Sequence, residues 1–163
     1  MHQVGVQTKT DLGEAYRENP STPVLTTLVV DEQRPGKSGR AGFYDYPEDG
    51  QKRLWPGLAE RFDAAGEQPS AQHLIDRFLF TQALESVRCI EEGVMVEADD
   101  IDYASIMGWG FAPFTGGPLS MIDTMGSAEF VRRCDELAAE HGDRFEPPQL
   151  LRDLAASGGR LRP

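Results

Sequence analysis

Cysteine and histidine are scarce in this 163-residue chain, and their spacing excludes the common disulfide and zinc frameworks. The two cysteines, Cys89 and Cys134, lie far apart among apolar neighbours and form no Cys-x-x-Cys or Cys/His zinc pattern. We therefore expect two reduced, partly buried thiols in a reducing compartment, with a disulfide as the alternative. The three histidines, His2, His73 and His141, have no acid partner at a fixed spacing, so we interpret them as structural or solvated rather than catalytic.

Long apolar runs and a basic, apolar leader are also missing. No stretch approaches the roughly 20 apolar residues that a membrane-spanning helix needs, and the first residues lack the pattern of a signal peptide. Lys and Arg number 16 against 27 Asp and Glu, which gives a net charge of −11. Such a charge repels phosphate backbones and anionic membranes. We expect a cytoplasmic protein with no membrane span and no nucleic-acid partner.

Helical periodicity dominates the rest of the chain, and no strand run is convincing. The strongest predicted helix begins after Ser70 and ends at Gly93, because its apolar residues cover more than half of the circumference. Capping residues, prolines and glycines delimit the others; we predict helices at 6–18, after Ser21, from Asp99 or Asp100 to Gly108, from Pro118 to Gly126, from Ser127 to Gly142 and at 149–156. The fold class predicted is all-α, a compact bundle of about six helices.

Two glycine-rich segments interrupt this pattern. The basic segment Gly36–Gly42 carries Lys37-Ser38, yet it lacks the full P-loop spacing and the βαβ context of a dinucleotide site, so nucleotide binding is not predicted. The second segment, Gly108–Pro118, combines four glycines, two prolines and three aromatics without an ionisable side chain. We interpret it as a packed helix–helix connection, with a ligand-binding loop as the alternative. Asp123, on the helix that follows, is predicted to be a satisfied polar residue beside a helix end.

Two stretches carry a resemblance to a known family. Gly39-Arg40-Ala41-Gly42-Phe43-Tyr44-Asp45-Tyr46 resembles the GKGFYxY signature that closes the helical domain of 3-hydroxyacyl-CoA dehydrogenases. The run from Asp76-Arg77-Phe78-Leu79 to Ile122-Asp123-Thr124-Met125-Gly126, including Gly108-Trp109-Gly110-Phe111-Ala112-Pro113-Phe114-Thr115-Gly116-Gly117-Pro118, resembles a second copy of that domain. The order is similar to the tail of the α subunit of the multifunctional fatty-acid β-oxidation complex, across nearly the whole chain.

The resemblance implies a domain organisation. Residues 1–50 would be the end of a first helical copy with its glycine-rich closure, and residues 51–69 a linker. Residues 70–157 would be the second copy, followed by a frayed tail at 158–163. In the full-length protein, enoyl-CoA hydratase and NAD-binding Rossmann domains would lie upstream.

The resemblance also implies that this part of the protein does no chemistry. The dehydrogenase His–Glu pair and the GxGxxG loop lie upstream in the family, and Phe80-Thr81-Gln82 stands where the first copy has its Asn. We therefore expect no catalytic, cofactor-binding or metal-binding residue here, and NAD only in the full-length oxidoreductase. The implied role is structural, with Trp109, Phe111 and Phe114 as packing anchors.

A different class of function stays open. A free-standing helical module could dimerise, dock a thiolase subunit or bind acyl-CoA. A truncated first copy would expose apolar surface on Val24, Leu25, Leu28 and Val29, and such patches favour association.

Overall fold

A computed structural model describes residues 2–62, 66 and 68–162, and the chain divides into two compact units. Unit 1 comprises Met1–Gln68 and unit 2 comprises Pro69–Pro163. Within the described residues there are eight α-helices and one ladder of two short strands, which confirms the all-α prediction. Residues 63–65 and 67 of the predicted linker lie outside the described residues. None of the described helices is long and apolar enough to cross a bilayer.

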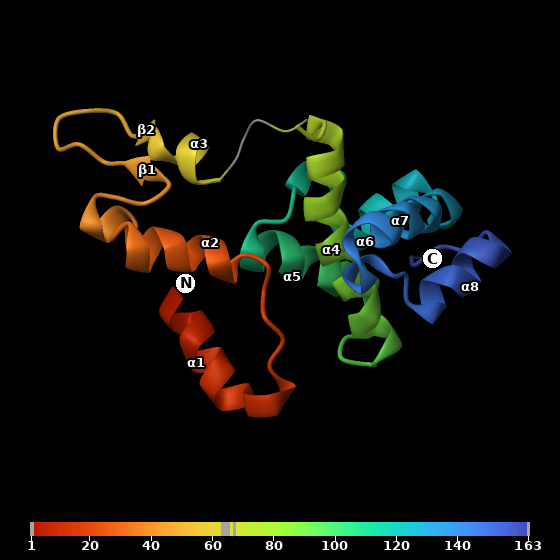
Figure 1. Ribbon diagram of the computed structural model, residues 1–163. Coiled ribbons are helices and arrows are strands. Elements are labelled where there is room, and N and C mark those ends of the chain that lie inside the picture. The colour runs from red at the N-terminus through yellow and green to blue at the C-terminus, as the bar shows by residue number, and fades with distance from the viewer. Residues whose placement is uncertain (1, 63–65, 67, 163) are drawn as a thin grey trace. The chain divides into compact units, whose positions relative to one another are not determined.

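Unit 1 contains three short helices and the ladder (Figure 1). Its helices are α1 (His2–Leu12), α2 (Thr22–Thr26) and α3 (Gly57–Arg61), and its strands are β1 (Tyr44–Asp45) and β2 (Arg53–Leu54). The first helix therefore begins and ends earlier than predicted, and α2 continues as a π-helical turn, Thr27–Asp31. The antiparallel pairing of β1 with β2 was not predicted, because two residues give no readable alternation.

Arg34 organises the glycine-rich closure of unit 1. Its guanidinium lies 4.3 Å from the centre of the Trp55 ring. It also donates hydrogen bonds to the carbonyl of Gly42 at 2.8 Å and to the carboxylate of Asp45 at 2.5 Å. These contacts bring the two strands together from one side chain, since Asp45 belongs to β1 and Trp55 follows β2.

Apolar burial in unit 1 is small. Leu28 is the one buried apolar side chain among its described residues, and α1 buries none. The prediction that Leu28 is exposed is therefore wrong, whereas Val24, Leu25 and Val29 keep partial exposure. The interior of unit 1 depends more on Arg34 and its partners than on packed aliphatic groups.

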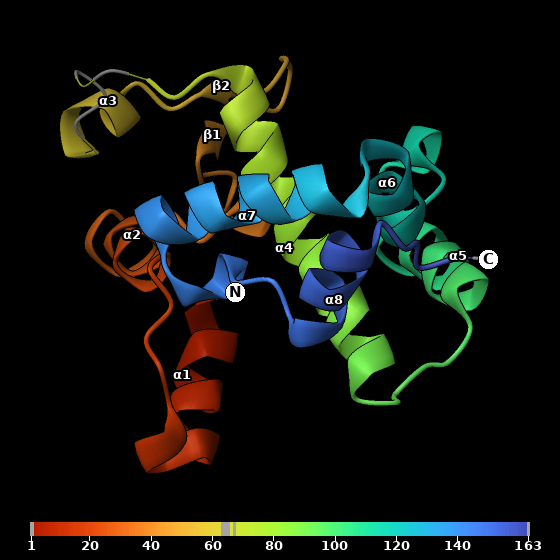
Figure 2. The ribbon, with the colours of Figure 1, turned by 90° about the vertical axis from the view of Figure 1, so that its right-hand side faces the viewer.

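Unit 2 is a bundle of five helices: α4 (Ala71–Glu91), α5 (Ala98–Trp109), α6 (Pro118–Met125), α7 (Ser127–His141) and α8 (Gln149–Ser157). The long helix α4 contacts α6 and α8, and α8 packs beside α7 (Figure 2). One apolar core joins all of them; its fully buried members include Phe80, Leu84, Leu119, Ile122, Phe130, Cys134 and Leu151. This central position explains the predicted apolar stripe of α4 from Phe80 onward, whereas Leu74, Ile75 and Phe78 near the start of the helix are exposed.

Most helix ends in unit 2 follow the predicted signals. The Ser70 hydroxyl accepts a hydrogen bond from the backbone N–H of His73 at 3.2 Å, as its predicted capping role requires. Gly126 and Gly142, both at φ 91°, end α6 and α7. The start of α5 differs, since Glu97 precedes its first residue and both predicted caps, Asp99 and Asp100, lie within its first turn.

The C-terminal tail makes specific contacts, although we expected it to be frayed. The carboxylate of Asp123 accepts hydrogen bonds from the backbone N–H groups of Leu161 at 2.8 Å and Arg162 at 3.1 Å. The hydroxyl of Ser127 donates to the carbonyl of Gly159 at 3.1 Å. Asp123, near the end of α6, is therefore satisfied as predicted, and its partners are backbone groups of the tail.

Candidate functional site

The connection between α5 and α6 is fixed by one buried carboxylate. Asp102 of α5 is 4% exposed and accepts hydrogen bonds from the backbone N–H of Leu119 at 2.8 Å and of Ser120 at 3.0 Å. The Ser120 hydroxyl donates a third bond at 2.5 Å. Leu119 and Ser120 stand in the first turn of α6, where helical N–H groups have no intrahelical partner and negative charge is favoured. A residue of one helix therefore caps the next.

Gly117 makes this approach possible. A Cβ at this position would lie 2.4 Å from the carboxyl group of Asp102, and the backbone φ of 120° disfavours any other residue. Thr115 supports the turn, because its hydroxyl donates to the carbonyl of Ala112 at 2.7 Å. The segment has the geometry of a packed connection, which was the interpretation favoured from the sequence.

The three aromatics of this segment have different surroundings. Phe111 is 2% exposed and belongs to the core of unit 2, whereas Trp109 is 80% exposed and Phe114 is 88% exposed. The three residues predicted to be packing anchors therefore differ in what they contact. Phe111 holds the segment to its own unit, and the other two rings project from it.

Apolar hollows adjoin both exposed rings. Phe114 lines the first hollow together with residues of the α4 start; these are Leu74, Ile75, Phe78 and Leu79. Phe78 is itself 72% exposed, and Leu74 and Ile75, in the preceding turn of α4, are 49% and 48% exposed. Trp109 lines the second hollow, between α4 and α5, with Cys89, Met95, Ile101 and Ala104 among its walls. These surfaces are fit for contact with another apolar body.

Gln82, one of the three residues that stand where the family of the resemblance has its Asn, lines that second hollow. Its side-chain amide donates to the carbonyl of Phe78 at 3.2 Å, and Thr81 donates to the carbonyl of Arg77 at 2.9 Å. Phe80 is buried. Both polar side chains thus donate a hydrogen bond within their own helix.

NAD, the cofactor implied by the resemblance, does not fit the basic glycine segment. A dinucleotide site binds the pyrophosphate at the N-terminus of an α-helix that follows the glycines. Here a 3-10 turn, Lys37–Gly39, and then strand β1 follow Gly36 instead of such a helix. A Cβ at Gly42 would lie 3.0 Å from the backbone of Gly36, so the segment closes on itself.

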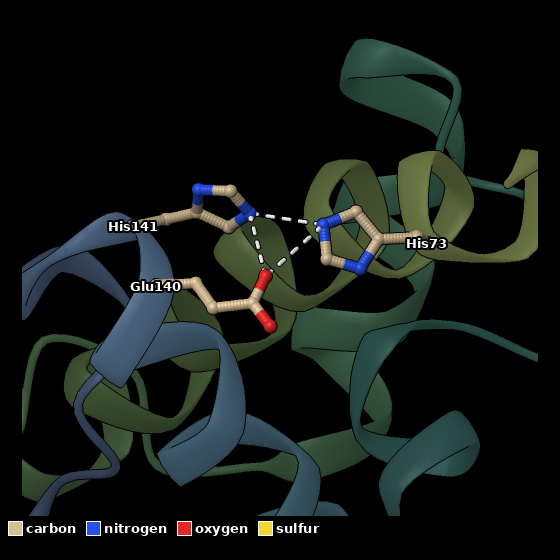
Figure 3. A group of neighbouring side chains, drawn as sticks. All are labelled: His73, Glu140 and His141. Carbon is tan, nitrogen blue, oxygen red and sulfur yellow. Dashed lines mark hydrogen bonds and ion pairs between the residues drawn. The ribbon is translucent and has the colours of Figure 1, made fainter. Parts of the chain in front are cut away.

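One polar cluster in unit 2 was missed by the sequence analysis. The Nε2 atoms of His73 and His141 lie 2.9 Å apart, and the same Glu140 oxygen lies 3.7 Å from the first and 3.6 Å from the second (Figure 3). Partial burial, followed by the charges of Arg77 and His73, lowers the pKa of His141 below its usual value. Two of the three histidines that were interpreted as structural or solvated are therefore neighbours. Their separation of 68 positions left no spacing signal in the sequence.

No protein-family model matches the chain.

Proposed function

We propose that the chain is the C-terminal helical part of a cytoplasmic, multifunctional 3-hydroxyacyl-CoA dehydrogenase, in which it is a non-catalytic packing module. The order of motifs in the sequence supports this assignment, from the GFYDY closure to the GWGFAPFTGGP segment. The complete protein would oxidise 3-hydroxyacyl-CoA to 3-ketoacyl-CoA and transfer the hydride to NAD, using domains upstream of residue 1.

The observation that carries the packing role is the presentation of Trp109 and Phe114. Both rings are exposed, yet Phe111, which lies between them, is buried in the core, and the start of α6 beyond Phe114 is held by Asp102. Holding large apolar groups rigidly in water has a free-energy cost that association with a partner removes. The partner proposed is the dehydrogenase module of the same polypeptide.

Two measurements test this proposal. Reading the coding DNA immediately upstream is the first; an in-frame Rossmann and hydratase region is expected, and an unrelated upstream sequence contradicts the assignment. The second follows NADH oxidation with acetoacetyl-CoA by the purified 163-residue chain. We expect no turnover, and turnover by this chain alone would contradict the non-catalytic role.

The packing role has its own test. The upstream domains, expressed separately, should bind the chain, and the double variant Trp109→Ser/Phe114→Ser should weaken that binding by at least about tenfold, because exposed aromatics are the usual hot spots of interfaces. Tyr103→Ser is a matched control, since Tyr103 is a 68% exposed aromatic on α5 that lines neither hollow. Equal binding by the double variant and the control would contradict the proposal.

The same exposed surfaces favour a second candidate, an independent module that dimerises, docks a thiolase subunit or binds acyl-CoA. Light scattering separates these readings, because a strict monomer at high concentration argues against dimerisation. Calorimetry with a long-chain acyl-CoA tests the apolar hollow beside Cys89 and Met95.

A further inference from the structure

The atoms of the His73–Glu140–His141 cluster form a triangle of the size that a metal ion requires. Its sides are 2.9, 3.6 and 3.7 Å. The nearest point equidistant from the three corners lies in their plane, about 2.0 Å from each atom, and a point about 0.6 Å above that plane, as tetrahedral coordination needs, lies about 2.1 Å from each. Both distances are within the bond lengths from zinc to imidazole nitrogen and carboxylate oxygen. No side chain would have to move far to bind an ion at that point.

We propose that His73, Glu140 and His141 bind a divalent transition-metal cation, with Zn²⁺ as the ion that suits these donors. Two imidazole nitrogens and one carboxylate oxygen form a donor set that zinc binds with three protein ligands, and water takes the fourth position. Figure 3 shows the two Nε2 atoms and the Glu140 oxygen turned toward one another, which is the arrangement expected of ligands around a shared centre.

The scaffold under the cluster holds the ligands in register. His73 is in the first turn of α4, where its backbone N–H is bound by Ser70, and the other two ligands end α7. An ion pair between Arg133 of α7 and Asp76 of α4 joins the helices near the cluster. Below it, the Phe80 and Phe130 rings pack with centroids 4.3 Å apart. The backbone positions of the three ligands are thus set by folding, which lowers the entropic cost of binding an ion.

The charges around the cluster act in both directions. Glu140 and the C-terminal end of α7 attract a cation, whereas Arg77 and Arg144 lie close enough to His141 to repel one. Both His side chains keep access to solvent, with 29% exposure for His73 and 22% for His141, so water screens these charges and an ion can enter. The ligand bonds themselves dominate over such screened terms.

A direct hydrogen bond between two neutral imidazoles is the alternative use of the same geometry. One Nε2–H would donate to the lone pair of the other, and no ion would be needed. The two arrangements exclude one another, because a metal ion occupies both Nε2 lone pairs. Titration with metal therefore distinguishes them.

The experiment uses the untagged full chain at pH 7.5, titrated with ZnCl₂ in a calorimeter and heated with and without the ion. We expect one Zn²⁺ per chain and a rise in Tm with Zn²⁺ concentration, since the ion binds the folded state. His73→Gln and His141→Gln should each weaken binding by at least about 100-fold, as losing a ligand costs more than losing an outer partner of one. Glu140→Gln should weaken it less.

His2→Gln is the matched control, because His2 is the one histidine outside the cluster and lies in unit 1. Its affinity should equal that of the natural sequence. Circular dichroism of each variant establishes that α4 and α7 remain folded, and the exposed Glu140 provides a variant with little effect on packing. Absence of binding at about 100 µM Zn²⁺, or binding that survives both His73→Gln and His141→Gln, would overturn the proposal.

Discussion

Asp102 is a buried carboxylate whose partners are two backbone N–H groups and one hydroxyl. It lies beneath the start of α6 and accepts three hydrogen bonds from Leu119 and Ser120. Removing a buried acceptor of this kind leaves its donors without a partner, and each unsatisfied buried donor lowers the stability of the fold by about 1–3 kcal/mol.

Replacing Asp102 should therefore destabilise unit 2 strongly. We expect Asp102→Ala to lower the free energy of unfolding by about 3–5 kcal/mol, because two N–H groups and a hydroxyl lose their acceptor. Asp100→Ala, at an exposed position of the same helix, should change it by less than about 1 kcal/mol. Urea denaturation followed by circular dichroism measures both, and equal effects would show that the buried carboxylate has no special role.

Cys134 gives the core a dependence on alkaline pH. Burial, followed by the charge of Asp135, raises the pKa of its thiol to about 12, whereas the thiol of an unfolded chain ionises near 8.5. The protonated form is thus favoured in the folded state. Its contribution to stability is complete below pH 8.5 and is lost as the pH rises toward 12.

Cys134→Ala tests this dependence. The natural chain should lose up to about 1.4 kcal/mol per pH unit more than the variant between pH 9 and 12, although the variant is less stable at neutral pH because of the cavity it creates. Cys89→Ala serves as the comparison at the half-buried thiol. Parallel stability curves for the natural chain and Cys134→Ala would refute the assignment.

At the scale of elements, two glycines near the connection between α5 and α6 differ in whether a larger side chain could replace them. Gly108 lies within α5 with no atom near its missing Cβ, whereas Gly117 has positive φ and the Asp102 carboxyl group at 2.4 Å from that position. Gly108→Ala should raise the free energy of unfolding by about 0.5–1 kcal/mol through helix propensity. Gly117→Ala should lower it by more than about 3 kcal/mol. Thermal unfolding of the two variants is the measurement, and effects of the same sign would contradict this reading.

Helices and their ends were the part of the fold that the sequence could predict. Ser70, Gly126 and Gly142 act through local backbone chemistry, so their neighbours in the chain are sufficient to predict them. The cap of α5 was misplaced by two or three residues because three acidic side chains stand close together there and only the backbone angles select Glu97.

Interactions between distant residues could not be predicted in the same way. Arg34 reaches Trp55 in unit 1, Asp123 reaches the tail, and His73 meets His141 across 68 positions. Each depends on how elements pack, and a single sequence holds no periodic signal for such pairs. The different burial of the three aromatics in the Gly108–Pro118 segment could not be predicted for the same reason. All three lie in one glycine-rich segment, and only its packing against the other helices buries Phe111 and leaves the other two exposed.

At the scale of the whole molecule, the two units differ in how much apolar surface they bury. The core cluster lies entirely within unit 2, whereas Leu28 is the one buried apolar side chain in the described part of unit 1. Stability of a small domain comes mainly from such burial. We therefore expect residues 69–163 alone to remain helical and to unfold cooperatively.

Residues 1–62 alone should give little ordered helix, because isolated short helices are marginal in water. Circular dichroism and thermal unfolding of the two fragments check both expectations. A fragment 69–163 without a cooperative transition would contradict the autonomy of unit 2.

The chain has two tryptophans, and one lies in each unit. The Trp55 indole is covered by the guanidinium of Arg34, whereas the Trp109 indole is open to water. Indole fluorescence responds to such differences in surroundings, so Trp55→Phe and Trp109→Phe each leave a single intrinsic reporter. Their emission spectra would follow each half of the polypeptide separately, without an added dye.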